Sequence, residues 1–331
     1  MIISYMSDTY CVAETVQALS APIEKLNECV AIGLGKVYEP CYVRQMLLAK
    51  GDEIRANLVA IHEKLDITIG YQEGLARVEG RDVRDLVDRA SCRVGHQVLT
   101  KQINIESVVG YAALKLKEVE SVSSDSVDED WLIRFFDYAA EVNSKDSQKL
   151  WANILSEEII RPGSYSLRTL DVLRNLSKCE AELFQRIVPL IIDNGKFCFL
   201  SAEEGILTKW GISFVEIMAL NDAGLISSSS ATNTATITEK KAILFHAGEL
   251  ICAVGCKNGQ KVDISYNVYA LTRAGEELRR LVSVESDKKY FIDVVRHIRQ
   301  QTALCSFGVH VIETQSEMNF TYRSSENLLF E

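Results

Sequence analysis

Apolar residues recur every three or four positions through most of the first half of the chain, which is the spacing of an amphipathic helix. This pattern predicts helices over residues 9–28, 42–64 and 100–119, and Pro22 is expected to break or restart the first of them. Between the last two, residues 78–95 interleave acidic and basic side chains three and four apart, which favours an exposed helix with local ion pairs. The N-terminal part of the chain is therefore predicted to be largely helical.

A second run of helices follows the polar, acidic linker SVSSDSVDED at residues 121–130. Asp128 is placed to cap a helix that includes Trp131, because a carboxylate accepts hydrogen bonds from the free N–H groups of a first turn. Ser177, with Glu180 three residues later, has the pattern of a capping box for a further helix. Large hydrophobic residues on these helices are expected to form one structural core: Trp131, Phe135, Phe136, Leu150 and Trp151.

The pattern changes to apolar runs of strand length after Asn194–Gly195. FCFL at residues 197–200 is predicted as a short strand, and helix is predicted within GISFVEIMALNDAGLI. TATIT, AILFHA, ELICAVG and VDISYNVYAL are predicted as strands, with a hairpin at Asn258–Gly259 because Asn-Gly suits a tight turn between paired strands. A helix over residues 271–282 completes an order of elements that is typical of a winged-helix domain.

The predicted fold class is α+β: a helical N-terminal half, then a winged-helix-like domain with additional antiparallel strands. A chain of 331 residues exceeds what one hydrophobic core usually organises, so several domains are expected. They are a helical N-terminal region over 1–120, a compact helical module over 121–186, the winged-helix-like domain over 187–284, and a C-terminal helix with short strands over 285–331.

Three segments of the chain carry a resemblance. They are GLGKVYEP at residues 33–40, QINIESVVGYA at residues 102–112, and the run over residues 127–184 that contains LWANILSEEI and PGSYSLRTL. With them the chain resembles an uncharacterised bacterial family of the "domain of unknown function 2806" type. The resemblance implies a bacterial or phage-borne intracellular protein, and it implies no activity. GLGKVYEP is also similar to a segment of some abortive-infection proteins, from which we take a role in phage defence as a hypothesis.

The acidic composition argues against nucleic acid as a partner. The formal net charge is −10, whereas proteins that hold nucleic acid usually present a basic face. Nine scattered cysteines without a predicted secretory leader favour a cytoplasmic protein with reduced thiols. No apolar run is long enough to span a membrane. Residues 23–38 could lie on a membrane surface, although packing inside the protein is the preferred interpretation.

Several catalytic and cofactor-binding motifs lack their required spacing. GLGK is not a phosphate-binding loop, because Val30 and Val37 stand where glycine and Ser or Thr are needed. The five histidines have no partner at zinc-binding spacing, and Cys252 with Cys256 is interpreted as a packed pair. We therefore predict no catalytic residue, no cofactor and no metal.

The winged-helix-like domain offers the candidates for nucleic-acid contact. Its expected recognition helix, at residues 213–223, contains no Lys or Arg, although a helix in the major groove needs donors for bases and phosphates. Lys240 and Lys241, between two predicted strands, are the residues that could touch a DNA backbone. Contact with a protein is the preferred use of this domain.

Arg168 is the polar residue of the helical tract that we expect to be partly buried. As a polar anchor it would bond Glu157 or Glu158, or the carbonyl groups at the end of the preceding helix. This structural role is preferred to contact with phosphate or nucleic acid.

The leading hypothesis is a non-enzymatic bacterial interaction or regulatory protein with a link to phage defence. Its expected contact is a protein partner or a further copy of the chain. The first alternative is a DNA-binding regulator that uses Lys240 and Lys241. The second is an enzyme whose site has no familiar motif.

Overall fold

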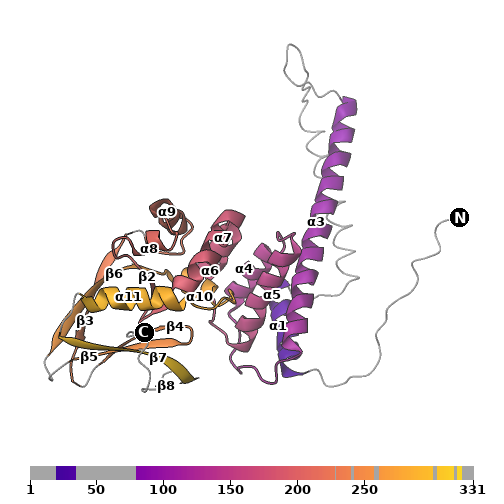
Figure 1. Cartoon of the computed structure of the whole chain (residues 1–331). Coiled ribbons are helices and arrows are strands. Elements are labelled where there is room, and N and C mark those ends of the chain that lie inside the picture. Colours follow the sequence, from indigo (N-terminus) through magenta and orange to yellow (C-terminus); the bar gives the residue numbers. More distant parts are fainter. Residues whose placement is uncertain are drawn as a thin grey trace, which may run out of the picture. The chain divides into compact units, whose positions relative to one another are not determined.

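The computed structural model describes residues 20–34, 80–227, 229–239, 242–256, 261–300, 304–316 and 319–322, with the backbone alone at 80–88 and from 313 onward. Helices make up the described N-terminal part, and an antiparallel sheet with further helices makes up the C-terminal part (Figure 1). The α+β class predicted from the sequence is therefore confirmed.

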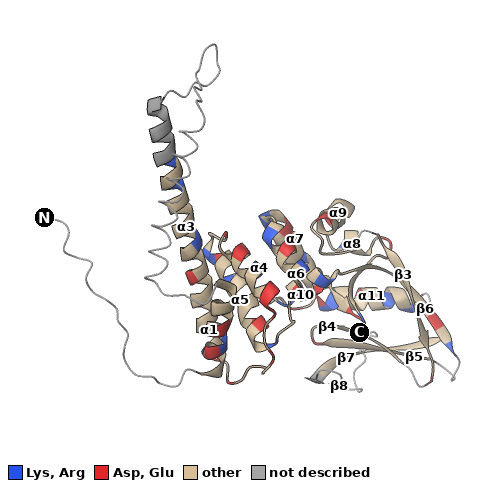
Figure 2. Ribbon diagram, turned by 180° about the vertical axis from the view of Figure 1, so that it is seen from behind, with Lys and Arg blue, Asp and Glu red and all other residues tan. Residues whose placement is uncertain are grey.

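The described helices of the N-terminal part are α1 (Ala21–Leu34), α3 (Gly80–Leu116), α4 (Glu129–Ala139) and α5 (Lys145–Ile160). α3 runs without a break from Gly80 to Leu116 and so joins the segments 78–95 and 100–119, which the sequence suggests as separate helices. Residues 96–99 contain neither proline nor a capping residue, so nothing in the chain ends the helix there. In the coloured part of α3, basic residues are spaced along the helix, and Glu106 supplies negative charge among them (Figure 2).

Aromatic side chains of α4 and α5 fill the core of this helical part. The rings of Trp131 and Phe135 stack with their centroids 5.1 Å apart, and Phe135 meets Trp151 at 5.4 Å. All three are buried. α1 reaches the same core at Gly33, where a Cβ atom would lie 2.2 Å from the ring of Phe136. Only glycine allows that approach, and it draws the apolar side of α1 into the protein.

A buried amide network joins α3 to the connection between α4 and α5. The Asn104 side chain donates to the Ala140 carbonyl at 2.9 Å and to Asn143 Oδ1 at 3.0 Å. Its own oxygen accepts from the Gln148 amide at 3.2 Å. Each polar atom of Asn104 thus has a partner, which a buried amide requires. Asp128 caps α4 by accepting from the Trp131 N–H at 2.8 Å, as predicted.

The C-terminal part begins with helices and continues with strands. Its helical elements are α6 (Leu167–Asn175), α7 (Lys178–Ile187), the 3-10 turn η1 (Val188–Leu190), α8 (Ile206–Lys209), α9 (Phe214–Asp222), α10 (Arg273–Arg279) and α11 (Lys288–Gln300). Its strands are β1 (Ile192–Asp193), β2 (Cys198–Ser201), β3 (Ala231–Ile237), β4 (Ile243–Ala247), β5 (Leu250–Cys256), β6 (Val262–Ala270), β7 (Cys305–Ser316) and β8 (Asn319–Tyr322). The predicted capping box of Ser177 and Glu180 is present at the start of α7.

The strands form one antiparallel sheet in the order β3–β6–β2–β1–β4–β5–β7–β8. β6 pairs with β3 and β2, whereas β5 pairs with β4 and β7. The hairpin predicted at Asn258–Gly259 is therefore wrong, although these two residues lie outside the described ranges. An Asn-Gly pair reports local turn preference, whereas the full-length pairing of β6 with β3 decides where β6 lies.

α11 covers one face of the sheet and closes the second core. Its apolar side carries Tyr290, Phe291 and Val294, which pack with buried strand residues such as Phe199. The Tyr290 hydroxyl also accepts from the Ser201 N–H at 3.0 Å, so its polar end is satisfied. The free energy gained by burying this apolar face is the main contribution that holds the helix to the sheet.

Glu277 is a buried carboxylate that ties α10 to the start of α6. It accepts from the Ser166 N–H at 2.7 Å, from the Thr169 hydroxyl at 2.5 Å and from Arg273 Nε at 2.7 Å. Ser166 is also the N-cap of α6. A single charge thus fixes the first turn of one helix against another.

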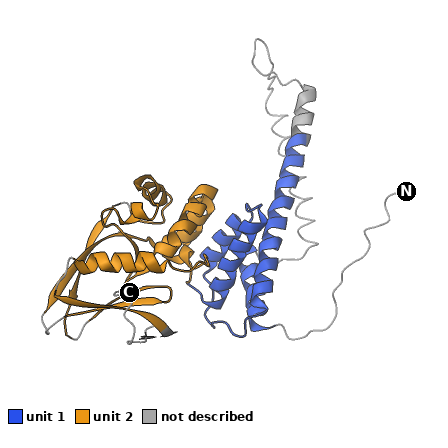
Figure 3. Cartoon of the chain, viewed as in Figure 1, with its two compact units in different colours: residues 1–163 blue, residues 164–331 orange. Residues whose placement is uncertain are grey.

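The chain divides into two compact units, Met1–Gly163 and Ser164–Glu331 (Figure 3). The boundary lies inside the segment 121–186, which the sequence suggests as a single module. Gly163 adopts a φ of 85°, in the left-handed region that ends a helical run without strain only at glycine. After that turn α6 contacts α10, so α6 belongs to the unit that contains the sheet.

Candidate functional site

α9 is held in a fixed orientation by hydrogen bonds at its first turn. Ser213 and Glu216 form a capping box, in which the Ser213 N–H donates to Glu216 Oε2 at 2.8 Å. Arg186 of α7 donates to Glu216 Oε1 at 2.9 Å and to the Gly211 carbonyl at 2.9 Å. Hydrogen bonds from Ser213, and then Arg186, lower the pKa of Glu216 and keep it ionised. α9 is therefore a preorganised element.

Both sides of α9 carry apolar side chains, but only one side is buried. Ile217 and Leu220 are buried in the core of the second unit. On the other side Phe214 is 68% exposed, Val215 73% and Met218 51%. α9 contains no Lys or Arg (Figure 2). Phe214, Val215, Met218 and the exposed Asp222 form the surface that we call the outer face of α9.

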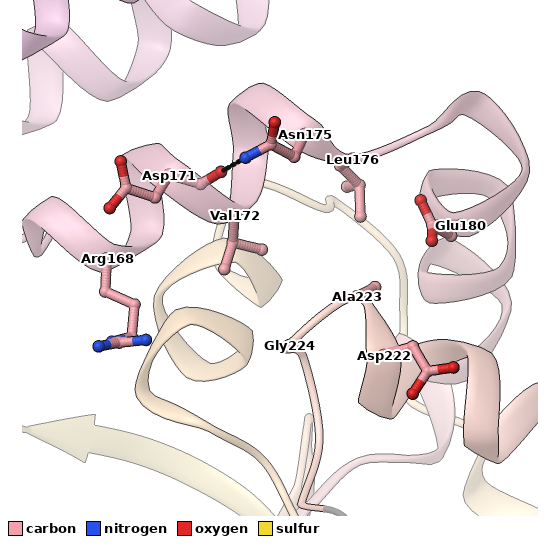
Figure 4. Close-up of a pocket in the computed structure, with 9 residues that line it drawn as sticks. All are labelled: Arg168, Asp171, Val172, Asn175, Leu176, Glu180, Asp222, Ala223 and Gly224. Atoms are coloured by element: carbon pink, nitrogen blue, oxygen red, sulfur yellow. Dashed lines mark hydrogen bonds between the residues drawn. The ribbon is translucent and has the colours of Figure 1, made fainter.

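A pocket of about 310 Å³ opens where α9 ends (Figure 4). Gly224 forms part of its wall, and its φ of 75° lets the chain turn sharply after the helix. Val172 of α6 and Leu176, the residue that caps its C-terminal end, supply apolar side chains that point toward the middle of the lining. The lining consists of Arg168, Asp171, Val172, Asn175, Leu176, Glu180, Asp222, Ala223 and Gly224.

Negative charge dominates the polar part of this pocket. Asp171, Glu180 and Asp222 contribute three carboxylates against the single guanidinium of Arg168. In Figure 4 Arg168 lies at the opposite end of the lining from Glu180 and Asp222. Hydrogen bonds from the Ser177 side chain and backbone lower the pKa of Glu180, so this carboxylate is charged at neutral pH. The end that lies nearest to α9 is therefore acidic.

Arg168 does not occupy the position predicted from the sequence. Its side chain is exposed, so the expected partial burial is wrong. Glu157 pairs instead with Lys115 at 3.3 Å, and Glu158 accepts from the Gly163 N–H at 2.6 Å. Arg168 is the second residue of α6, where its Cα–Cβ bond leads away from the core that Thr169 and Leu170 enter.

The other residues singled out from the sequence fall into two groups. Trp131, Phe135 and Trp151 lie in the core of the first unit and are not available to a ligand. Lys240 and Lys241, the candidates for nucleic-acid contact, lie outside the described residues. Most of GLGKVYEP, on which the likeness to abortive-infection proteins rests, lies outside them as well.

A cluster of polar residues at the end of β1 has the composition of a catalytic site. Asp193 Oδ2 lies 3.4 Å from His246 Nε2 and 3.5 Å from Arg279 Nη2. Burial raises the pKa of Asp193, but hydrogen bonds from His246 and the Gly195 N–H outweigh it and lower the value to about 2. Burial also raises the pKa of the neighbouring Cys198 to about 12. That thiol is protonated at neutral pH and is a poor nucleophile, so the cluster is best explained as a structural ion pair.

The described residues show neither a metal-binding cluster nor a membrane-spanning helix. Within the described ranges, no three His, Cys, Asp or Glu side chains are arranged to hold a metal ion. Among the helices of those ranges, none combines the length and apolarity needed to cross a bilayer. α1, from the segment considered for surface contact with a membrane, buries Leu26, Cys29 and Val30 within the first unit.

A family model described as "Protein of unknown function (DUF2806)" matches residues 88–295, well over half of the chain. The chain belongs to this family. The DUF2806 match begins in α3 and ends in α11, so it contains α9 and the whole lining of the pocket. Comparisons with curated proteins and with solved structures found no match.

The outer face of α9 was not predicted from the sequence. GISFVEIMAL is apolar around more than one side of a helix, which is usually the mark of a fully buried helix. In this DUF2806 protein only one side is buried, and the excess apolar residues face outward. The absence of Lys and Arg from the helix was visible in the sequence, and it pointed in the same direction.

Proposed function

We propose that this DUF2806 protein acts by binding another protein through the outer face of α9, without catalysis of its own. The observation that carries the proposal is the exposure of Phe214, Val215 and Met218 on a helix whose other side is packed. Contiguous apolar surface of this kind gains free energy when a partner covers it. Aromatic and methionine side chains are also enriched in protein interfaces.

The order of elements in the second unit supports this use of α9. α7, β2, α8 and α9 precede β3, and β6 lies between β2 and β3 in the sheet. This order supports the interpretation of the second unit as a winged helix, with β4 and β5 inserted between its two wing strands. α9 then has the place of the recognition helix, which contacts DNA through polar and basic side chains in DNA-binding members of the class.

The chemistry of α9 favours protein over DNA at that place. Its outer face offers apolar side chains and the carboxylate of Asp222, and none of these donates to a phosphate or a base edge. Glu216, the other charged residue of the helix, is paired with Arg186. A DNA-binding regulator that uses Lys240 and Lys241 is therefore the alternative.

Site-specific photo-crosslinking tests the proposal. A photoreactive residue at Val215, in the chain expressed in its host, should give a discrete crosslinked product, because this side chain is the most exposed of the three. The same substitution at Val284, a matched valine that is 51% exposed, should give none. Phe214→Ser and Met218→Ser should remove the product. A product that persists in both variants, or the absence of any product at Val215, would contradict the proposal.

The DNA alternative has its own test. We expect no salt-dependent binding of duplex DNA at low ionic strength, where phosphate contacts are strongest. Binding that is lost on charge reversal by Lys240→Glu and Lys241→Glu would favour the alternative. The phage-defence hypothesis is tested separately, by comparing phage plating on cells that carry the wild-type chain with cells that carry Phe214→Ser. Equal plating efficiencies would argue against a role of the α9 contact in defence.

A further inference from the structure

The outer face of α9 continues into the acidic pocket. Asp222 follows Met218 by four positions, as Met218 follows Phe214, so the three side chains share one side of the helix. Asp222 is at the same time part of the pocket lining. The apolar side chains and the pocket therefore form one continuous surface, and a partner that covers the first also lies over the second.

The pocket combines the two properties that a basic side chain requires. Val172 and Leu176 offer apolar contact to an aliphatic stem, and Glu180 offers its carboxylate to the cationic end. Asp222 adds a second negative charge at the edge of the pocket, although its carboxylate points outward in Figure 4. Lys and Arg are the residues that bury a stem while their charge remains at a polar boundary. The capping box with Ser177 fixes Glu180 in place, so its carboxylate needs little reorganisation to accept a cation.

We propose that the partner is a basic protein that inserts a Lys or Arg side chain into this pocket while neighbouring apolar residues cover Phe214 and Met218. The inference rests on the proposed function and adds the chemistry of the partner. A second copy of the chain is a poorer occupant, because the net charge of −10 makes two copies repel each other. The same charge attracts a basic partner and raises its association rate.

Two variants each remove one negative charge from the pocket and should leave the fold intact. Glu180→Gln keeps a residue that can complete the capping box of α7. Asp222→Asn removes a negative charge from a helix C-terminus, where such a charge is unfavourable to the helix dipole. The matched control is Glu285→Gln, an exposed carboxylate beside Ser286, which lies against the β4–β5 turn at Gly248.

The probe is a displayed library of random peptides, selected on the full-length chain and counter-selected on the double variant Phe214→Ser, Met218→Ser. Enriched peptides should pair a Lys or Arg with large apolar residues. Their affinity should fall about tenfold in the double variant Glu180→Gln, Asp222→Asn, since each exposed ion pair contributes modestly. It should be unchanged in Glu285→Gln.

The outcomes separate this inference from the function on which it rests. Enriched peptides without a basic residue, or affinities that the pocket variants leave unchanged, would overturn the basic partner and leave α9 as a binding surface. If no peptide survives counter-selection, the outer face of α9 is not a docking surface, and both proposals fail. Peptides that bind the pocket variants more tightly would show a partner of the opposite charge.

Discussion

Glu277 shows how one buried charge can organise several parts of the second unit. Its carboxylate accepts from a backbone N–H, a hydroxyl and a guanidinium, and it is 5% exposed. The net stabilisation from such buried hydrogen bonds is modest. Removing the acceptor costs more, because it leaves buried donors without a partner. The surface pair of Lys178 and Glu182, at 3.7 Å, has no such consequence.

The first prediction follows from that difference. Glu277→Ala should lower the free energy of unfolding by about 3 kcal/mol, because Ser166 and Thr169 lose their common acceptor. Glu277→Gln, which keeps one oxygen, should cost about half as much. Lys178→Ala should change it by less than about 0.5 kcal/mol. Urea denaturation monitored by circular dichroism measures all three free energies of unfolding. Equal losses for Glu277→Ala and Lys178→Ala would contradict the expectation.

Asp193 gives a prediction for pH dependence. Its pKa is about 2 in the folded chain, below the ordinary 3.8, because the hydrogen bonds from His246 and Gly195 outweigh burial. A depressed pKa stabilises the fold above the unfolded value, and that contribution disappears as the pH falls from about 4 to about 2. It amounts to about 2 kcal/mol.

Asp193→Asn should remove this pH dependence. Unfolding free energies of the wild-type chain and the variant should differ by about 2 kcal/mol at pH 6 and converge near pH 2. The control is Asp222→Asn, the same substitution at an exposed carboxylate. A constant difference between wild type and Asp193→Asn at every pH would mean that the charge of Asp193 contributes nothing.

At the scale of elements, α9 combines a structural side and an exposed side, and the two can be separated by stability alone. Phe214→Ser and Met218→Ser should each change the free energy of unfolding by less than about 0.5 kcal/mol, because both side chains already face solvent. Leu220→Ala should cost about 3 kcal/mol, because Leu220 is fully buried. Thermal unfolding measures the difference; a large loss in Phe214→Ser would place that ring in the core.

Elements with strong local signals were predictable from the sequence, whereas those set by distant pairing were not. Asp128 and the Ser177–Glu180 pair predict helix starts, because their side chains can hydrogen-bond to the backbone of the first turn. Both predictions are confirmed. The hairpin at Asn258–Gly259 failed because β6 pairs with strands that are distant in sequence. The outer face of α9 could not be foreseen, since a helical period shows which residues are apolar but not which side is covered.

At the scale of the whole molecule, each unit has a hydrophobic core of its own. The first contains the aromatic residues around Phe135, and the second contains the sheet, α7, α9 and α11. A core defect in one unit should therefore leave the other intact.

Trp151→Ala tests this independence. The cavity should destabilise the first unit by about 3 to 5 kcal/mol and speed amide hydrogen exchange in α3, α4 and α5. Exchange in β2, β6 and α11 should remain as in the wild-type chain. Leu220→Ala serves as the reciprocal control, with faster exchange in the second unit only. Loss of protection across both units in either variant would show that they unfold as one.

The outer face of α9 also has a consequence for how the protein behaves at high concentration. At low ionic strength the net charge of −10 keeps chains apart over a Debye length of roughly 10 Å or more. Added salt shortens that range and at the same time strengthens the association of apolar surfaces such as Phe214, Val215 and Met218. The chain should thus associate more readily as the salt concentration increases. Phe214→Ser should raise the salt concentration up to which the protein stays monodisperse.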